Sequence, residues 1–108
     1  MSTKVEIIGN IGNDVELKKP NDKLTVVELS IATKETWKDH EGNEKEQTDW
    51  HTAKFYGKFA EEAAKFQKGN FVNVSGKLKY DEFEDKQGSK HKRAYVHGFS
   101  IAKVEKKQ

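Results

Sequence analysis

Residues 33–58 read TKETWKDHEGNEKEQTDWHTAKFYGK, and this stretch holds both tryptophans of the chain, Trp37 and Trp50. After Trp50 the residue types alternate as in a strand, whose successive side chains point to opposite faces. One face then carries two aromatic rings with a lysine between them: Trp50, Lys54 and Tyr56. The other face carries His51, Ala53 and Phe55. Because an unpaired charge is seldom buried, the first face is unsuited to a core but suited to stacked bases and phosphates.

The composition indicates a small domain with a modest core. The chain has 108 residues, of which 33% are hydrophobic and 35% are charged. It has no cysteine, so neither a disulfide framework nor a thiolate metal site is expected. The sequence shows no signal-peptide pattern and no apolar run of membrane-spanning length, so we expect a cytoplasmic protein. The net charge is only +2, and any basic surface must therefore come from the placement of charges.

Strands are predicted on both sides of this stretch from the alternation of apolar and polar residues. Val27, Leu29 and Ile31, for example, would share one face. We expect five strands, at residues 4–12, 23–33, 49–56, 70–83 and 92–104. Residues 15–18 would extend the first strand, and residues 19–22, with the only proline, would form a turn. Residues 34–48 are expected to be a charged loop.

One helix is predicted at residues 59–66. Phe59, Ala63 and Phe66 recur at helical spacing, and Gly69 follows as a signal for the helix end. We expect these aromatic rings to pack in the core. In the last strand, four residues are expected to share one face: Tyr95, His97, Phe99 and Ile101.

The predicted order is three strands, one helix and two strands. This is the order of the five-stranded Greek-key OB barrel, an all-β fold with a helix between strands 3 and 4. Such barrels bind oligonucleotides or oligosaccharides on the face of strands 2 and 3, where the tryptophan-rich stretch falls. We expect one domain at residues 1–105 and a short polar end at residues 106–108.

The sequence gives little support for a catalytic site, a metal site or a nucleotide-binding loop. The four histidines, His40, His51, His91 and His97, are scattered among elements, so no set of nucleophile and base is assigned. The DHEGNE segment at residues 39–44 has its glycine at the wrong position for a calcium loop. The GNIG segment at residues 9–12 lacks the spacing of phosphate-binding loops. We therefore expect a protein that is not an enzyme and that has no cofactor and no metal.

Several short segments, taken in order and spacing, carry a resemblance to a known family. They are IGNIG at residues 8–12, SIAT at 30–33, QTDWH at 47–51, FYGK at 55–58, KG at 68–69 and SGKL at 75–78. Together they resemble the bacterial single-stranded DNA-binding protein family, and the match runs through almost the whole chain. The resemblance implies sequence-independent binding and protection of single-stranded DNA in replication, repair and recombination. It also implies a homotetramer, and a cytoplasmic, nucleoid-associated location.

The resemblance assigns roles to individual residues. Four rings fall on the family's base-stacking positions: Trp37, Trp50, Tyr56 and Phe83. Three lysines fall on basic or phosphate-contacting positions: Lys38, Lys58 and Lys68. We add Lys54 because of its place between the rings of its own strand. His51 matches a histidine associated with subunit assembly.

Two departures from the family pattern bear on function. Around Phe83 lie four acids, Asp81, Glu82, Glu84 and Asp85, where the family is usually basic. Their charge is expected to weaken that part of the DNA path. The chain stops at Lys106-Lys107-Gln108, without the acidic tail that recruits replication proteins in the family, so such recruitment is not expected. The chain is either a trimmed core or a minimal version such as a phage or plasmid carries.

Other interpretations of the same pattern stay open. An RNA-binding or replication-restart OB module would use similar rings. A protein-interaction OB domain would use them without any affinity for nucleic acid. Trp50 and Tyr56 would also fit a packed site under a loop or at a subunit interface.

Overall fold

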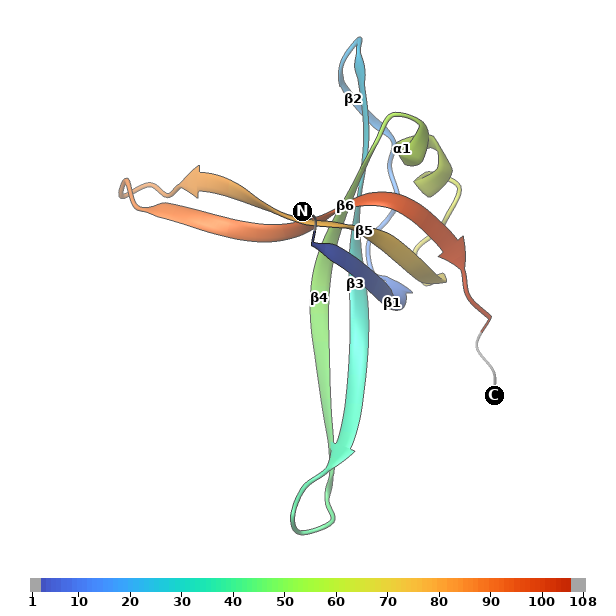
Figure 1. The fold of residues 1–108 in the computed structure, drawn as a ribbon, viewed down its shortest axis with the longest axis vertical. Helices are drawn as coiled ribbons and strands as arrows, with labels where there is room; N and C mark the ends of the chain where they lie inside the picture. The colour runs from blue at the N-terminus through green and yellow to red at the C-terminus, as the bar shows by residue number, and fades with distance from the viewer. Residues whose placement is uncertain (1–2, 106–108) are drawn as a thin grey trace.

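Six strands and one short helix make up residues 3–105, the part of the chain that the computed structural model describes (Figure 1). In chain order they are β1 (Lys4–Ile11), β2 (Lys18–Asn21), β3 (Leu24–Lys38), β4 (Glu44–Tyr56), α1 (Lys58–Ala63), β5 (Phe71–Glu84) and β6 (Lys90–Lys103). The expected polar end, residues 106–108, lies outside the described residues.

The strands form one closed sheet. Its order is β1-β5-β6-β4-β3-β2, and β1 also pairs with β3, which closes the barrel. The pairing of β4 with β6 is parallel, and the other pairings are antiparallel. Apart from the short β2, the order is three long strands, a helix and two long strands. This is the predicted arrangement, with the helix after the third long strand.

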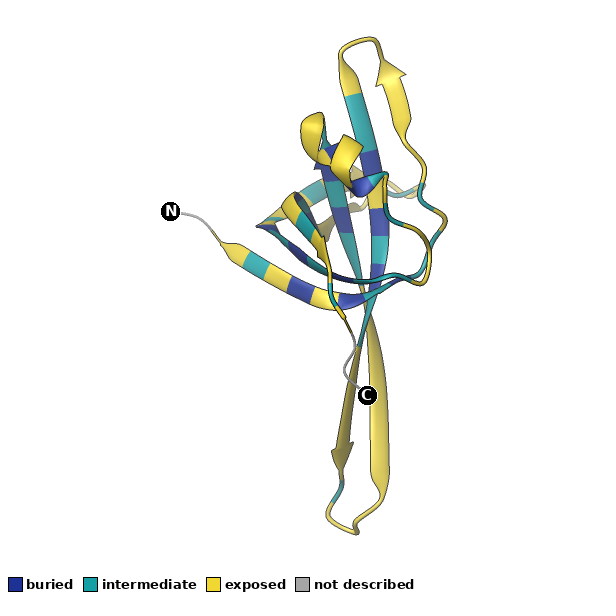
Figure 2. Ribbon diagram, turned by 90° about the vertical axis from the view of Figure 1, so that its right-hand side faces the viewer, coloured by how far each residue is buried: buried dark blue, intermediate teal, exposed yellow. Residues whose placement is uncertain are grey.

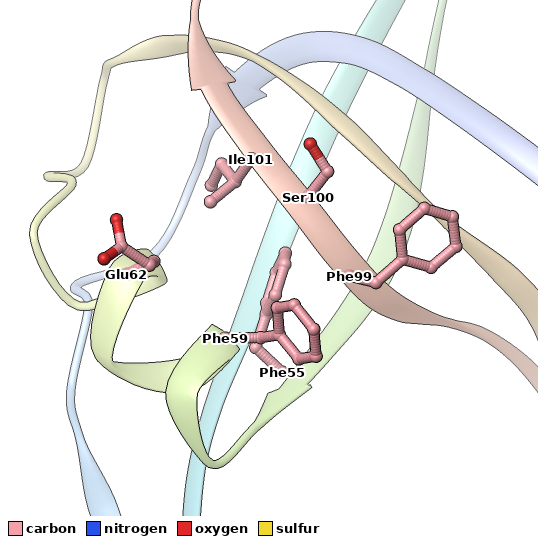
Figure 3. A pocket seen from close by; sticks show the side chains of 6 residues that line it. All are labelled: Phe55, Phe59, Glu62, Phe99, Ser100 and Ile101. Carbon is pink, nitrogen blue, oxygen red and sulfur yellow. The ribbon is translucent and has the colours of Figure 1, made fainter.

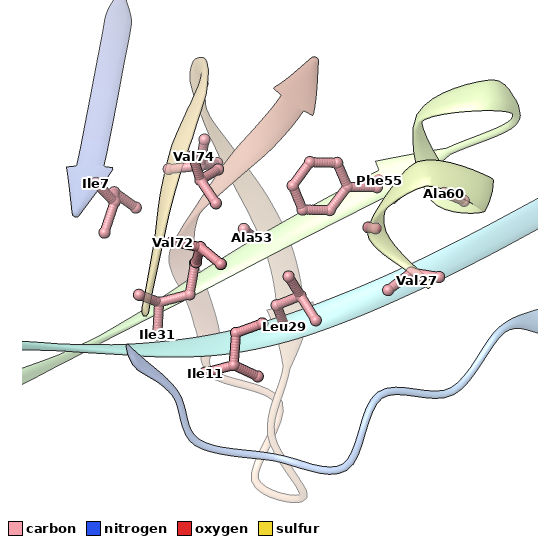
Figure 4. Packing of buried hydrophobic residues seen from close by; sticks show 12 residues of the cluster. Ile7, Ile11, Val27, Leu29, Ile31, Ala53, Phe55, Ala60, Val72 and Val74 are labelled. Carbon is pink, nitrogen blue, oxygen red and sulfur yellow. The ribbon is translucent and has the colours of Figure 1, made fainter. Parts of the chain in front are cut away.

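The core fills the centre of the barrel, as the dark residues of Figure 2 show. It consists of twelve buried apolar residues: Ile7, Ile11, Val27, Leu29, Ile31, Ala53, Phe55, Ala60, Ala63, Val72, Val74 and Val96 (Figure 4). The Phe55 ring, with no exposed surface, lies directly against Gly98 of β6. A Cβ atom at position 98 would overlap this ring, so the close packing of the two strands requires glycine there.

A β-bulge in β6 changes which residues face the core. The pairing with β5 moves from Ser100 directly to Gly98, which leaves Phe99 as an extra residue. Ile101 therefore packs against the core, although His97 on the other side of the bulge does not. The prediction that Tyr95, His97, Phe99 and Ile101 share one face was wrong, because a bulge leaves no trace in simple alternation.

Two long hairpins leave the barrel in different directions (Figure 1). We call residues 34–50 the β3–β4 arm and residues 79–94 the β5–β6 arm. None of the residues in either arm is buried. Residues 34–48 were predicted as a loop, but only residues 39–43 leave the strands. The strands here are polar on both sides, so they show no apolar alternation.

Three smaller predictions also fail. Residues 15–18 do not extend the first strand, because β1 ends at Ile11 and residues 12–17 belong to no strand. Residues 18–21 form β2, which pairs with β3 through Lys18 and Asn21, whereas residues 19–22 were expected to form a turn. The helix ends at Ala63, and its buried face consists of alanines rather than of the predicted aromatic rings. Phe59 is 46% exposed, and only Phe66 packs against the core as expected. None of the helices among residues 3–105 is long and apolar enough to cross a membrane.

Candidate nucleic-acid interface

The outer face of β4 carries the residues that the alternation predicted. Ala53 and Phe55 are buried, whereas Trp50 is 63% exposed and Lys54 and Tyr56 are half-buried. This division confirms the predicted facing of the strand. The outer face therefore presents an open indole at one end and a phenol ring at the other, with an ammonium group between them.

The Trp50 indole rests on the backbone just after β1. Its ring lies directly over Gly12, where a Cβ atom would overlap the ring carbons. The Gly12 N–H donates to the Ser30 carbonyl at 2.8 Å, which ties this backbone to β3. Glycine at position 12 thus lets the indole lie against the backbone while most of its surface stays open.

Lys54 is held by groups from the two strands next in the sheet. Its Nζ donates to Asp81 Oδ2 at 2.6 Å and lies 4.5 Å from the centroid of the Tyr95 ring. The hydrogen bond to Asp81 raises the pKa of Lys54 above its usual value, so the group stays charged. The lysine predicted to meet a phosphate is therefore already paired with a carboxylate of the same chain.

Tyr56 contacts a histidine that the sequence did not single out for binding. The ring centroids of Tyr56 and His97 are 5.0 Å apart. Burial raises the pKa of the Tyr56 phenol. Burial also lowers the pKa of His97, and the charges of Lys79 and Lys77 add to this shift. Near neutral pH the Tyr56–His97 pair is therefore uncharged, which suits an aromatic face.

A groove of about 420 Å³ runs between β4 and the base of the β5–β6 arm. It is lined by Glu28, Thr52, Lys54, Asp81, Glu82, Phe83, Arg93 and Tyr95. Cations and carboxylates both line it, so its charge is mixed. The groove brings together Phe83, which the resemblance assigned to base stacking, and Lys54, which was added from its facing on the strand.

Phe83 is covered in part by residues of β6. The His91 ring stacks on it with centroids 5.3 Å apart and planes 24° apart. The Arg93 guanidinium lies 5.0 Å from the same ring centroid. The ring is still 42% exposed, but its nearest stacking partners belong to its own chain.

Trp37 lies farther out, on the β3–β4 arm, and is 47% exposed. It pairs across the hairpin with Lys45, whereas Trp50 pairs with Ala32 near the barrel. Positions 45 and 50 of β4 are about 17 Å apart at 3.4 Å per residue. The two indoles are therefore separate platforms. Lys38 lines the same shallow hollow as Trp37, and its side chain forms no ion pair within the described chain.

The remaining predicted residues are more scattered. Lys68 lies in a turn tied to β1, since the Gly69 N–H donates to the Ile11 carbonyl at 2.8 Å, next to the Gly12 that supports Trp50. Lys58 begins α1, and its side chain has no ring contact or ion pair among residues 3–105. His51 Nε2 is hydrogen-bonded to Thr33 Oγ1 at 2.9 Å.

Reasoning from the sequence missed four residues of β6 on this surface: His91, Arg93, Tyr95 and His97. The alternation around Val96 does place Tyr95 and His97 on the outer face. Their contact with β4 depends on the parallel pairing of Lys54 with His97, and no local pattern predicts that pairing.

A second hollow, of about 210 Å³, lies between α1 and β6 (Figure 3). Its lining residues are Phe55, Phe59, Glu62, Phe99, Ser100 and Ile101. The lining contains a carboxylate but neither lysine nor arginine, so it is a poor site for a polyanion.

The fold and this surface define a small OB barrel whose third long strand carries an open indole, a lysine and a phenol ring on its outer face. The model of the single-strand binding protein family matches residues 2–104. The chain therefore belongs to the single-strand binding protein family.

Curated relatives agree with this assignment. The chain is 36% identical over 107 residues to single-stranded DNA-binding protein 1 of Xylella fastidiosa (strain 9a5c), covering 97% of this chain and 79% of that protein. It is 40% identical over 86 residues to a single-stranded DNA-binding protein of Xanthomonas campestris pv. campestris, covering 79% and 50% respectively. The chain spans about half the length of three curated relatives that it matches, namely 52%, 50% and 48% of them.

The solved structures concern the fold alone. A complex of Plasmodium falciparum SSB with ssDNA has a TM-score of 0.83 at 23% identity, with 97% of both chains covered. A deletion mutant of the single-stranded DNA binding protein from Thermus aquaticus has a TM-score of 0.79 at 24% identity. That match covers 94% of this chain and 50% of the other. The predicted barrel, with its helix after the third long strand, is confirmed.

Proposed function

We propose that this protein binds single-stranded DNA without sequence preference and protects it. The observation that carries the proposal is the outer face of β4, where a 63% exposed Trp50 lies in line with Lys54 and Tyr56. Membership of the single-strand binding protein family supports it. The protein would act by binding, without catalysing a reaction.

Stacking would provide the affinity that is independent of sequence. Every base has a π-face, and stacking on an aromatic side chain contributes about 1–3 kcal/mol per base. Trp37 and Trp50 would each receive a different base, because about 17 Å of hairpin separates them. Tyr56 and Phe83 would provide further contacts on the barrel and at the groove.

Lysines would contribute a part of the binding free energy that depends on salt concentration. Each phosphate that a lysine neutralises lowers the logarithm of the affinity by about 0.7 per tenfold rise in salt. Lys38, Lys58 and Lys68 form no ion pair among the described residues, so they are available for phosphates. Duplex DNA would bind weakly, because its bases are already stacked on one another.

The wider role would be the protection of unpaired strands during replication, repair and recombination. We further propose that copies assemble into a homotetramer, with His51 near a subunit contact. A mass in solution of four chains is expected, and a mass of one chain would rule the assembly out. The family's recruitment of replication proteins through an acidic tail is not part of this proposal.

Trp50→Ala tests the proposal most directly. Fluorescence anisotropy of a labelled oligo-dT reports binding without relying on the tryptophans. The variant is expected to bind about 5- to 150-fold more weakly, the equivalent of about 1–3 kcal/mol. Phe59→Ala is the matched control, since Phe59 is 46% exposed but lies by the hollow that lacks cations.

Thermal unfolding of both variants would show that the barrel is intact. Equal affinity of Trp50→Ala and the wild type, with the fold intact, would refute stacking at β4. Tighter binding to oligo-rU than to oligo-dT would instead identify an RNA-binding module. Absence of binding to either strand would leave an OB domain for protein interactions.

A further inference from the structure

The cation at the centre of the proposed DNA face is already occupied. Lys54 lies between Trp50 and Tyr56 on β4, where a backbone phosphate would meet it. Its Nζ instead donates to Asp81 Oδ2 at 2.6 Å. The Lys54 side chain is 23% exposed and that of Asp81 is 46% exposed, so the carboxylate is the more open partner.

Asp81 pairs with Lys54 rather than with the cation opposite it in the sheet. In the pairing of β5 with β6, Asp81 lies directly opposite Arg93, which would be the simplest cation for it to meet. Among the described residues these two form no ion pair, and Arg93 lies over the Phe83 ring instead. Asp81 reaches across β6 to β4 and places a negative charge in the groove beside the proposed DNA path.

We propose that Asp81 competes with DNA phosphate for Lys54 and thereby weakens the binding of single-stranded DNA at this face. This inference rests on the proposed function. A carboxylate and a phosphate accept hydrogen bonds from an ammonium group in the same way. A phosphate can therefore replace the carboxylate at Lys54 Nζ only when Asp81 is displaced. The displaced carboxylate then repels the phosphate.

The competition has a signature in the salt dependence. A free lysine that meets a phosphate releases one counterion from the DNA, and the slope of log affinity against log salt steepens by about 0.7. Lys54 is already neutralised by Asp81, so in the wild type it adds nothing to that slope. The slope should therefore reveal whether Lys54 is free.

Asp81→Asn tests the proposal, with Glu84→Gln as the matched control. Both changes remove one negative charge from β5, but Glu84 is exposed and forms no ion pair among the described residues. Asp81→Asn is expected to bind oligo-dT about fivefold more tightly than Glu84→Gln at about 0.1 M salt, with a slope steeper by about 0.7. Glu84→Gln should keep the slope of the wild type.

Lys54→Met completes the test, because it keeps an apolar side chain over Tyr95. In the Asp81→Asn background it should remove the added slope of about 0.7, and in the wild-type background it should leave the slope unchanged. Circular dichroism and thermal unfolding establish that each variant is folded.

Two results separate this inference from the proposed function. If the wild type binds oligo-dT and Asp81→Asn binds no more tightly than Glu84→Gln, Asp81 merely anchors the β5–β6 arm and the inference is wrong. If neither the wild type nor Glu84→Gln binds oligo-dT, the proposed function itself is wrong.

Discussion

The β3–β4 arm and the β5–β6 arm share one architecture but present their rings differently. Trp37 is 47% exposed and Phe83 is 42% exposed, so exposure alone hardly separates them. The two rings differ in the side chains that contact them. His91 stacks on Phe83 and Arg93 lies over it, whereas no ring or guanidinium of the described chain contacts Trp37 in this way. A ring is ready for a base only when its own chain leaves it free.

The charges of the two arms differ in part. On the β3–β4 arm, Lys34 pairs with Glu46 at 3.1 Å, but Lys38 beside Trp37 forms no ion pair among residues 3–105. On the β5–β6 arm, His91 lies 2.8 Å from Asp85, and the Asp81 carboxylate holds Lys54. The first arm therefore offers an uncovered ring beside a free cation. On the second arm Phe83 is covered and Asp81 and Asp85 are paired, although Lys79, Lys86 and Lys90 form no ion pair among the described residues.

The largest difference is expected from removing the two rings. Trp37→Ala should weaken binding to oligo-dT by about 1–3 kcal/mol, or about 5- to 150-fold. Phe83→Ala should cost less than about fivefold, because a base must first displace His91 or Arg93. Anisotropy titrations at one salt concentration measure both. Equal losses would mean that the neighbours of Phe83 do not compete with bases.

An intermediate effect is expected from the lysines of the arms. Lys38→Gln should make the salt slope shallower by about 0.7, because a free lysine is removed. Lys92→Gln on the other arm, whose lysine lies 3.9 Å from Glu82, should change the slope less. Titrations at several salt concentrations give both slopes. A larger change for Lys92→Gln would reverse the comparison.

The smallest expected effect is on how the free energy of unfolding depends on pH, through His97 at the base of the β5–β6 arm. The pKa of His97 in the folded protein lies below its ordinary value of about 6.5, so the unfolded chain binds more protons between these two pKa values. The free energy of unfolding should therefore fall modestly as pH drops below about 6.5, and should not change from this group above it. His97→Gln should flatten this part of a urea-unfolding profile. An unchanged profile would show that His97 is not the source.

Reasoning from the sequence predicted the barrel well because local patterns determine most of it. Val27, Leu29 and Ile31 alternate with polar residues, and so do Ala53 and Phe55, since each faces the same core. The β3–β4 arm was missed because residues 34–48 face solvent on both sides of the hairpin. Nothing in such a stretch distinguishes a polar ribbon from a polar loop.

The sequence predicted which β4 side chains form the candidate site, but not the ion pair that one of them makes. The facing of β4 placed Lys54 between Trp50 and Tyr56, as the structure has it. The acidic residues were expected to weaken the DNA path, but the specific pairing of Lys54 with Asp81 was not predicted. That pairing joins residues 27 positions apart and depends on the order of strands in the sheet.

The arms also affect how the molecule unfolds locally. Because residues 34–50 and 79–94 bury no side chain completely, these ribbons add length without adding to the hydrophobic centre. A two-stranded ribbon is marginally stable by itself, so the barrel must hold each arm at its base. Amide protons near the tips should therefore exchange with solvent through local fraying, at a small fraction of the free energy that opens the barrel.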